Sequence, residues 1–129
     1  MPDKPLPTDA ELAILSVLWK RGPSTVRDVH EALRASQDTG YTTVLKLLQI
    51  MMQKGLVRRD ESQRSHVYRA AVTCDGTQRR LVGDLLEKAF AGSARDLVMR
   101  ALSVKPASRE ELAAIRALLD EAEKKERTS

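Results

Sequence analysis

Apolar residues recur every three or four positions over long stretches of this chain, and short polar breaks separate these stretches. This spacing is typical of amphipathic helices. The first stretch follows Thr8-Asp9-Ala10-Glu11, a capping box in which a hydroxyl and a carboxylate stand three residues apart. It predicts a helix over about 9–20 that Gly22-Pro23 ends.

A second helix is expected over about 25–35, with Ser24 as its cap. Residues 36–40 carry the Ser, Gln, Asp, Thr and Gly composition of a turn. The predicted inner face of this helix is Val26, Val29, His30 and Leu33. We read His30, on an apolar face, as a half-buried structural histidine.

A third helix is predicted over about 41–54, where Gly55 ends it. At 100° per residue its apolar back is Val44, Leu47, Leu48 and Met51. Its front is Thr42, Lys46, Gln49 and Gln53. This front offers hydrogen-bonding side chains and no acid, whereas a solvated helix front usually mixes Glu with Lys.

Two short β-prone runs follow, over 56–61 and 65–70, and a polar turn at 62–64 joins them into a predicted hairpin. Their apolar residues are Leu56, Val57, Val67 and Tyr68. Three helices and a basic hairpin form the winged variant of the helix-turn-helix. In that motif the third helix lies in the major groove and the hairpin tip touches phosphate.

The rest of the chain is predicted to form short amphipathic helices, with a break at Gly92 and caps at Ser93 and Ser108. Helices of this length have little core of their own, so their apolar stripes favour burial against a second copy. We therefore predict a winged-helix domain over 1–72 and a helical dimerisation domain over 73–129. The candidate dimer contacts are Leu81, Leu85, Leu86, Phe90, Leu97, Leu112, Ile115 and Leu119.

Composition narrows the function classes. The chain of 129 residues is 42% hydrophobic, and no run approaches the apolar length of a membrane span. Residues 1–7 lack the apolar core of a secretory signal, so we expect a cytoplasmic protein. One cysteine, Cys74, and two histidines leave no metal-ligand spacing, and we expect no metal and no cofactor. Ser24, Ser62 and Ser65 have no partner base in the sequence, which argues against an enzyme.

Positive charge is concentrated in the segment 41–70. The whole chain has a net charge of +4, and this segment, with six basic residues against two acids, carries +4 by itself. Such a segment attracts phosphate by Coulomb forces and counterion release. A solvated surface with chance clustering is the alternative on charge alone.

About residues 6–125 resemble the penicillinase-repressor family of BlaI/MecI/CopY-type transcriptional repressors. The segments that carry the resemblance are LPTDAELAILSVLW, GYTTVLKLLQIMMQKGLVRRD, SHVYRA and FAGSARDLVMRAL. The resemblance implies a mainly α fold, with a winged helix-turn-helix domain, a small β-hairpin wing and a C-terminal helical dimerisation domain. It also implies a bacterial, cytoplasmic homodimer that represses transcription from a palindromic operator in double-stranded DNA.

In this family the third helix and the wing contact DNA. Together with the helical wheel and the charge, this gives the candidate DNA-binding residues Thr42, Thr43, Lys46, Gln49, Arg58, Arg64, Ser65 and His66. Of Arg58 and Arg59, one is expected at a phosphate and the other paired with Asp60 or Glu61. Leu45 stands where β-lactamase repressors have a basic residue, and it packs at the core edge or touches a thymine methyl.

The resemblance suggests a membrane sensor peptidase as a partner. In β-lactam-responsive members, release from DNA follows cleavage of the repressor between an Asn and a Phe. The aligned pair here is Arg100-Ala101, so identical cleavage is not carried over. The paired cysteines of the copper-responsive branch are also missing, and the inducing signal stays open. An alternative from another class is a winged-helix protein-interaction module, or an adaptor, that binds a partner protein and no specific DNA. Such a module needs neither the acid-free front nor the basic segment.

Overall fold

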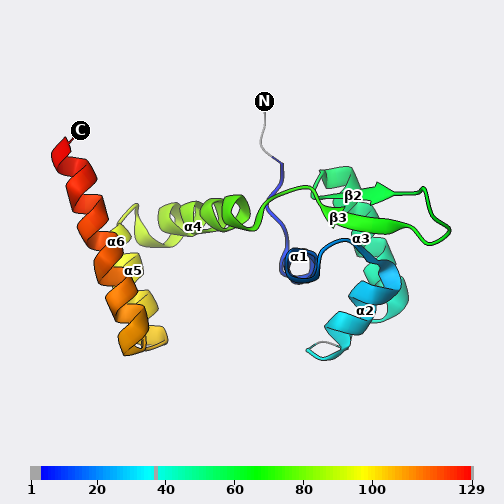
Figure 1. The fold of residues 1–129 in the computed structure, drawn as a ribbon, viewed down its shortest axis with the longest axis horizontal. Helices are drawn as coiled ribbons and strands as arrows, with labels where there is room; N and C mark the ends of the chain where they lie inside the picture. Colours follow the sequence, from blue (N-terminus) through cyan, green and yellow to red (C-terminus); the bar gives the residue numbers. More distant parts are fainter. Residues whose placement is uncertain (1–3, 37, 129) are drawn as a thin grey trace. The chain divides into compact units, whose positions relative to one another are not determined.

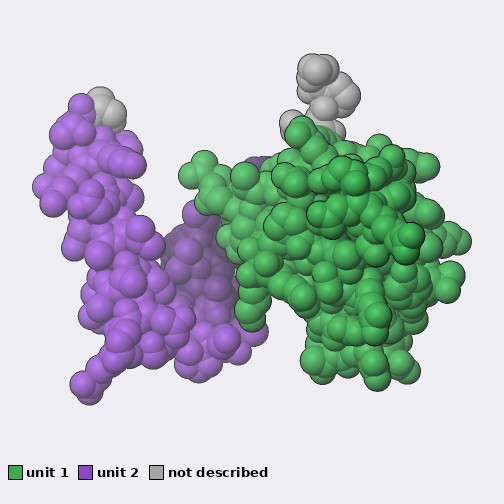
Figure 2. Space-filling model, turned by 45° about the vertical axis from the view of Figure 1, so that its right-hand side comes forward, with its two compact units in different colours: residues 1–83 green, residues 84–129 purple. Residues whose placement is uncertain are grey.

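A computed structural model describes residues 4–36 and 38–128. These residues form two compact units, which are divided between Gly83 and Asp84 (Figure 2). Gln37, in the predicted turn, and residues 1–3 of the N-terminal segment lie outside the described part. The elements are, in chain order, α1 (Asp9–Arg21), β1 (Ser24–Thr25), α2 (Val26–Arg34), α3 (Tyr41–Lys54), β2 (Val57–Asp60), β3 (Val67–Ala70), α4 (Cys74–Phe90), α5 (Ala94–Val104) and α6 (Arg109–Thr128) (Figure 1).

The three predicted N-terminal helices are confirmed as α1, α2 and α3. The capping box at the start of α1 is present: the Glu11 N–H donates to Thr8 Oγ1 at 3.2 Å, and the Thr8 N–H donates to Glu11 Oε1 at 2.9 Å. Gly55 ends α3 with a φ of 80°, in the left-handed region that a residue with a Cβ rarely adopts. Local capping signals therefore set these boundaries.

The prediction that Ser24 caps the second helix is wrong. Thr25 is the N-cap of α2: its hydroxyl accepts from the Asp28 N–H, and the Asp28 carboxylate accepts from the Thr25 N–H. Ser24 is buried in β1, opposite Tyr68, and its hydroxyl donates to the Gly22 carbonyl. Ser24 is thus part of the sheet rather than of the helix.

The predicted hairpin is confirmed as β2 and β3. The two strands are antiparallel, with Val57 opposite Ala70 and Arg59 opposite Tyr68. Strand β1 adds to the free edge of β3, which makes a three-stranded sheet in the order β1-β3-β2. Both edges of β3 are therefore paired, and the sheet attaches the wing to the helices.

One hydrophobic core joins the first three helices to the sheet. Its buried residues are Ile14, Leu15, Leu18, Val26, Val29, Leu33, Val44, Leu48, Met51, Leu56, Val57 and Tyr68. Three of the four residues predicted for the back of α3 belong to this core, and the fourth, Leu47, packs at its edge. The opposite face of α3 is consequently turned to solvent.

The first unit continues into α4, beyond residue 72, after which the sequence places the domain boundary. The Trp19 indole Nε1–H donates to the Val72 carbonyl at 2.9 Å, and Thr77, in the first turn of α4, is buried. The Arg80 guanidinium donates to the Lys4 carbonyl. These contacts attach the segment after β3 to α1 and to the N-terminal segment.

The second unit contains the end of α4 together with α5 and α6. The predicted caps are present: Ser93 accepts from the Asp96 N–H, and Ser108 and Glu111 form a reciprocal capping box. Gly92, with a φ of 80°, follows the end of α4. In the described part of this unit no residue is buried, so its apolar stripes lack a core within one chain.

Candidate nucleic-acid interface

Helix α3 presents a polar front to solvent. The side chains exposed along it are Tyr41, Thr42, Thr43, Lys46, Gln49 and Gln53. The helix contains no Asp or Glu, and in the described part of the chain Lys46 has no acidic ion-pair partner. This surface can donate and accept hydrogen bonds and carries positive charge.

An ion pair fixes the far end of α3 against α1. The Lys54 ammonium donates to both carboxylate oxygens of Glu11, at 3.0 and 2.8 Å, and Glu11 is only 1% exposed. Burial alone raises the pKa of Glu11, but hydrogen bonds from Lys54 and from the Thr8 N–H together bring the pKa below its usual value. Lys54 therefore belongs to the basic segment 41–70, but in the folded chain Glu11 balances its positive charge.

The wing carries exposed basic residues on β2 and on its turn. Arg58 is exposed on β2, whereas Arg59 pairs with Glu61, as expected for one of these two arginines. A hydrogen bond with the buried Tyr68 hydroxyl helps to raise the pKa of Arg59. Arg64 is exposed in the turn between the strands and has no ion-pair partner among the described acids.

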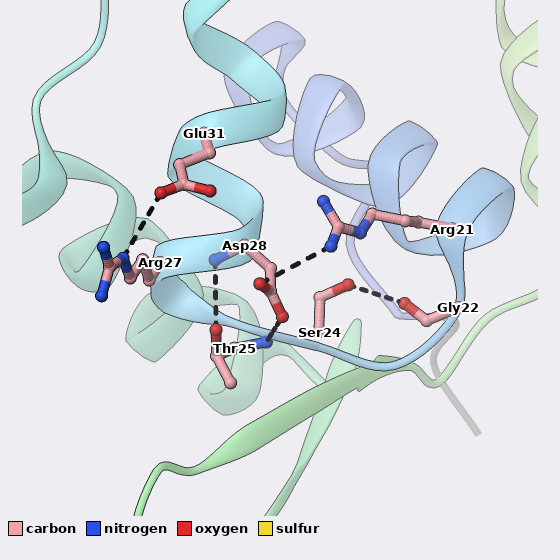
Figure 3. A network of polar contacts seen from close by, with 7 residues as sticks. All are labelled: Arg21, Gly22, Ser24, Thr25, Arg27, Asp28 and Glu31. Carbon is pink, nitrogen blue, oxygen red and sulfur yellow. Dashed lines mark hydrogen bonds and ion pairs between the residues drawn. The ribbon is translucent and has the colours of Figure 1, made fainter.

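A polar network holds the start of α2 beside the end of α1 (Figure 3). Asp28 caps the helix together with Thr25 and lies 3.6 Å from the Arg21 guanidinium. The hydrogen bonds from Thr25 are the main cause that lowers the pKa of Asp28. Arg27 and Glu31 pair on the exposed side of the same helix, at 3.3 Å. The network sets the position of the helix that precedes α3.

The start of α2, the start of α3 and the wing surround a hollow of about 410 Å³. It is lined by Thr25, Val26, Arg27, Tyr41, Leu45, Arg64, Ser65, His66 and Tyr68. Two of these described residues are arginines and none is an acid. The Tyr41 ring, 49% exposed, meets the ring of the half-buried His30 edge-on, with centroids 6.0 Å apart.

All eight residues predicted to bind DNA are exposed. Arg64, Ser65 and His66 line the hollow, while the four on α3 and Arg58 lie outside its lining. Sequence reasoning did not select the other polar lining residues, Thr25 and Arg27. The spacing of Thr25 and Asp28 is itself a capping signal that places both at the start of a helix.

The residues predicted to form a dimer are divided between the two units. Leu81 belongs to the first, where it lines a groove with Trp19 and Cys74, a half-buried free thiol. The other seven belong to the second unit, and among them Leu85 and Leu119 are 47% and 59% exposed.

Two kinds of feature are missing from the described residues. Across 4–36 and 38–128, no helix is both long and apolar enough to cross a bilayer. The same residues contain no group of three or more His, Cys, Asp or Glu side chains placed to hold a metal ion.

Two solved structures resemble part of this chain. The solution structure of the DNA-binding domain of the repressor BlaI matches with a TM-score of 0.51 and 24% identity, covering 57% of this chain and 90% of that one. The Bacillus licheniformis BlaI monomer, solved in complex with the blaP half-operator, matches with a TM-score of 0.50 and 24% identity, covering 58% and 92%. These likenesses show the winged-helix fold.

Sequence comparison covers more of the chain. The transcriptional regulator BlaI of Mycobacterium tuberculosis, found in two strains, is 38% identical over 92 residues, which are 70% of this chain and 67% of that protein. The family model of the penicillinase repressor matches residues 7–121. The chain therefore belongs to the penicillinase repressor family, whose members are transcriptional regulators and not enzymes.

Proposed function

We propose that this protein represses transcription by binding a palindromic DNA operator as a homodimer. Each protomer inserts the front of α3 into the major groove and sets the wing against the adjacent backbone. The observation that carries this is the acid-free, exposed front of α3 beside the arginine-bearing hollow. The half-operator named for the Bacillus licheniformis BlaI complex supports the same type of ligand for this chain.

The candidate contacts fall into two groups with different tasks. Thr42, Thr43, Lys46 and Gln49 project from α3, where side chains reach base edges. Arg58, Arg64, Ser65 and His66 belong to the wing, and we assign them to the sugar-phosphate backbone. Affinity then comes mainly from phosphate contacts, and sequence preference comes from the α3 group.

Dimerisation is assigned to the second unit because its apolar stripes have no core within one chain. Leu97, Leu112 and Ile115 are half-buried, and Leu119 is exposed, within amphipathic helices that hold no buried residue in the described range. A two-fold pair buries these stripes and repeats α3 on two half-sites about one DNA turn, roughly 34 Å, apart. Such a repressor acts on the chromosome, which places it in the cytoplasm.

We propose proteolysis as a route of release from DNA. Arg100 and Ala101, aligned with the cleaved pair of β-lactam-responsive repressors, are exposed on α5. Cleavage there by a membrane sensor peptidase is one route, and it requires a specificity different from that for Asn and Phe.

The test is selection from a pool of randomised duplex DNA at ~0.15 M salt, followed by sequencing. An enriched inverted repeat is the expected result. Binding without an enriched sequence contradicts sequence-specific repression. Absence of binding favours a winged-helix module that recognises a protein.

A further inference from the structure

We infer that Leu45, together with Tyr41, reads the 5-methyl group of a thymine in each half-site. This inference rests on the proposed DNA-binding function and names a specificity residue within it. Both side chains line the hollow between α3 and the wing. Being four residues apart, they lie one above the other on the same face of α3.

The two side chains form a fixed apolar wall. Leu45 is half-buried and packs against the hydrophobic core, so its position is set by the fold. Tyr41 is 49% exposed, but its ring meets that of His30 edge-on at a centroid distance of 6.0 Å. A wall held in this way needs little reorganisation when a ligand group contacts it.

The opposite side of the hollow is cationic and polar. Arg64 and Ser65 line it from the wing, and no acid is present among its described lining residues. The occupant must therefore combine an anionic group with a small apolar group nearby. A DNA strand offers this combination where a backbone phosphate lies beside a thymine, because the 5-methyl is the apolar group that the bases expose in the major groove.

The experiment compares thymine with uracil, which lacks only the methyl group. In the inverted repeat obtained by selection, each thymine is replaced singly, and symmetrically in both half-sites, by uracil. Burial of one methyl group corresponds to about a fourfold change in affinity per half-site, or roughly fifteenfold for both. We expect this loss at one symmetric position and little change at the others. Since the selected DNA is unmethylated, the methyl belongs to thymine and not to 5-methylcytosine.

Two variants assign the effect to Leu45. Leu45→Met keeps an apolar side chain of similar length and is expected to keep the preference for thymine over uracil. Leu45→Gln is similar in length but polar. For this variant the ratio of the affinities for thymine-containing and uracil-containing DNA is expected to be close to one. Thermal unfolding of both variants checks that the fold is retained, and the uracil scan of the unchanged protein tests the methyl contact without any variant.

The outcomes separate this inference from the proposed function. Specific binding with no uracil-sensitive position overturns the methyl contact and leaves the repressor function in place. Equal sensitivity in the unchanged protein and in Leu45→Gln overturns the role of Leu45. Failure to enrich any sequence contradicts the repressor function, and the inference is then lost with it.

Discussion

The Lys54 ammonium, at the last residue of α3, lies 2.8 Å from Glu11 Oε2 in the first turn of α1. The same carboxylate accepts from the Thr8 N–H and so completes the cap of α1. One buried side chain thereby joins the start of α1 to the end of the helix that we assign to the major groove. Removing it affects both the stability of α1 and the position of α3.

The two partners of this ion pair are expected to differ in their importance for stability. Lys54→Met leaves the Glu11 carboxylate buried without its cation and is expected to lower the free energy of unfolding by roughly 2–3 kcal/mol. Glu11→Gln leaves Lys54, whose side chain is 29% exposed, within reach of water, and is expected to cost about 1 kcal/mol. Urea unfolding measures both values. A larger loss for Glu11→Gln would contradict this order.

The ion pair also predicts how stability depends on pH. The folded-state pKa of Glu11 lies below its usual value of 4.5, so its contribution is full well above pH 4.5 and is lost as the pH falls through the lowered pKa. We expect the melting temperature to fall more steeply below pH 4.5 in the unchanged protein than in Glu11→Gln. The pKa values of Asp28 and Asp60 are also lowered. These two residues make the same contribution to the pH dependence of stability in both proteins. Parallel curves would refute the assignment to Glu11.

Two alanine variants distinguish the two groups of DNA contacts. Lys46→Ala is expected to weaken operator binding about tenfold and to reduce the preference for operator over random DNA. Arg64→Ala is expected to weaken binding to both DNAs alike and to reduce the salt slope by about 1. Lys20→Ala, at an exposed lysine of α1 outside the hollow, is the control for loss of one charge. If Lys46→Ala weakened binding to operator and random DNA equally, this result would contradict the assignment of α3 as the helix that reads the base sequence.

A charge placed on the apolar stripe of α6 is expected to separate the dimer. Leu119 is 59% exposed in the single chain, so Leu119→Asp leaves the folded protomer intact but places a carboxylate in the proposed interface. Ala117→Asp introduces the same charge at an exposed position away from the stripe formed by Leu112, Ile115 and Leu119. Sedimentation should give a monomer for Leu119→Asp and a dimer for Ala117→Asp. Identical masses for the two variants would argue against this interface.

Much of the first unit could be predicted because its signals are local. The capping box at Thr8 and Glu11 and the left-handed Gly55 set the ends of α1 and α3 within a few residues of the predicted ones. The hairpin follows from two β-prone runs around a polar turn. The exposed front of α3 follows from helical periodicity, since the buried back of the helix fixes the opposite face.

The features that were missed depend on contacts between distant parts of the chain. Strand β1 has two residues, too few for any periodicity, and it forms only because Ser24 pairs with Tyr68. Glu11 and Lys54 are 43 residues apart, and no local pattern indicates that they form an ion pair. Tyr41 became a candidate only when the fold placed the wing opposite it, whereas the sequence left Leu45 between packing at the core edge and contact with a thymine methyl.

Sequence-specific repression is tested by the ratio of two dissociation constants at ~0.15 M salt. One is for the duplex that carries the selected inverted repeat, and the other is for a duplex of the same composition in scrambled order. A sequence-specific dimeric repressor is expected to give a ratio of at least ~10³ and to bind as two protomers per duplex. A ratio near one would contradict sequence-specific repression by this protein.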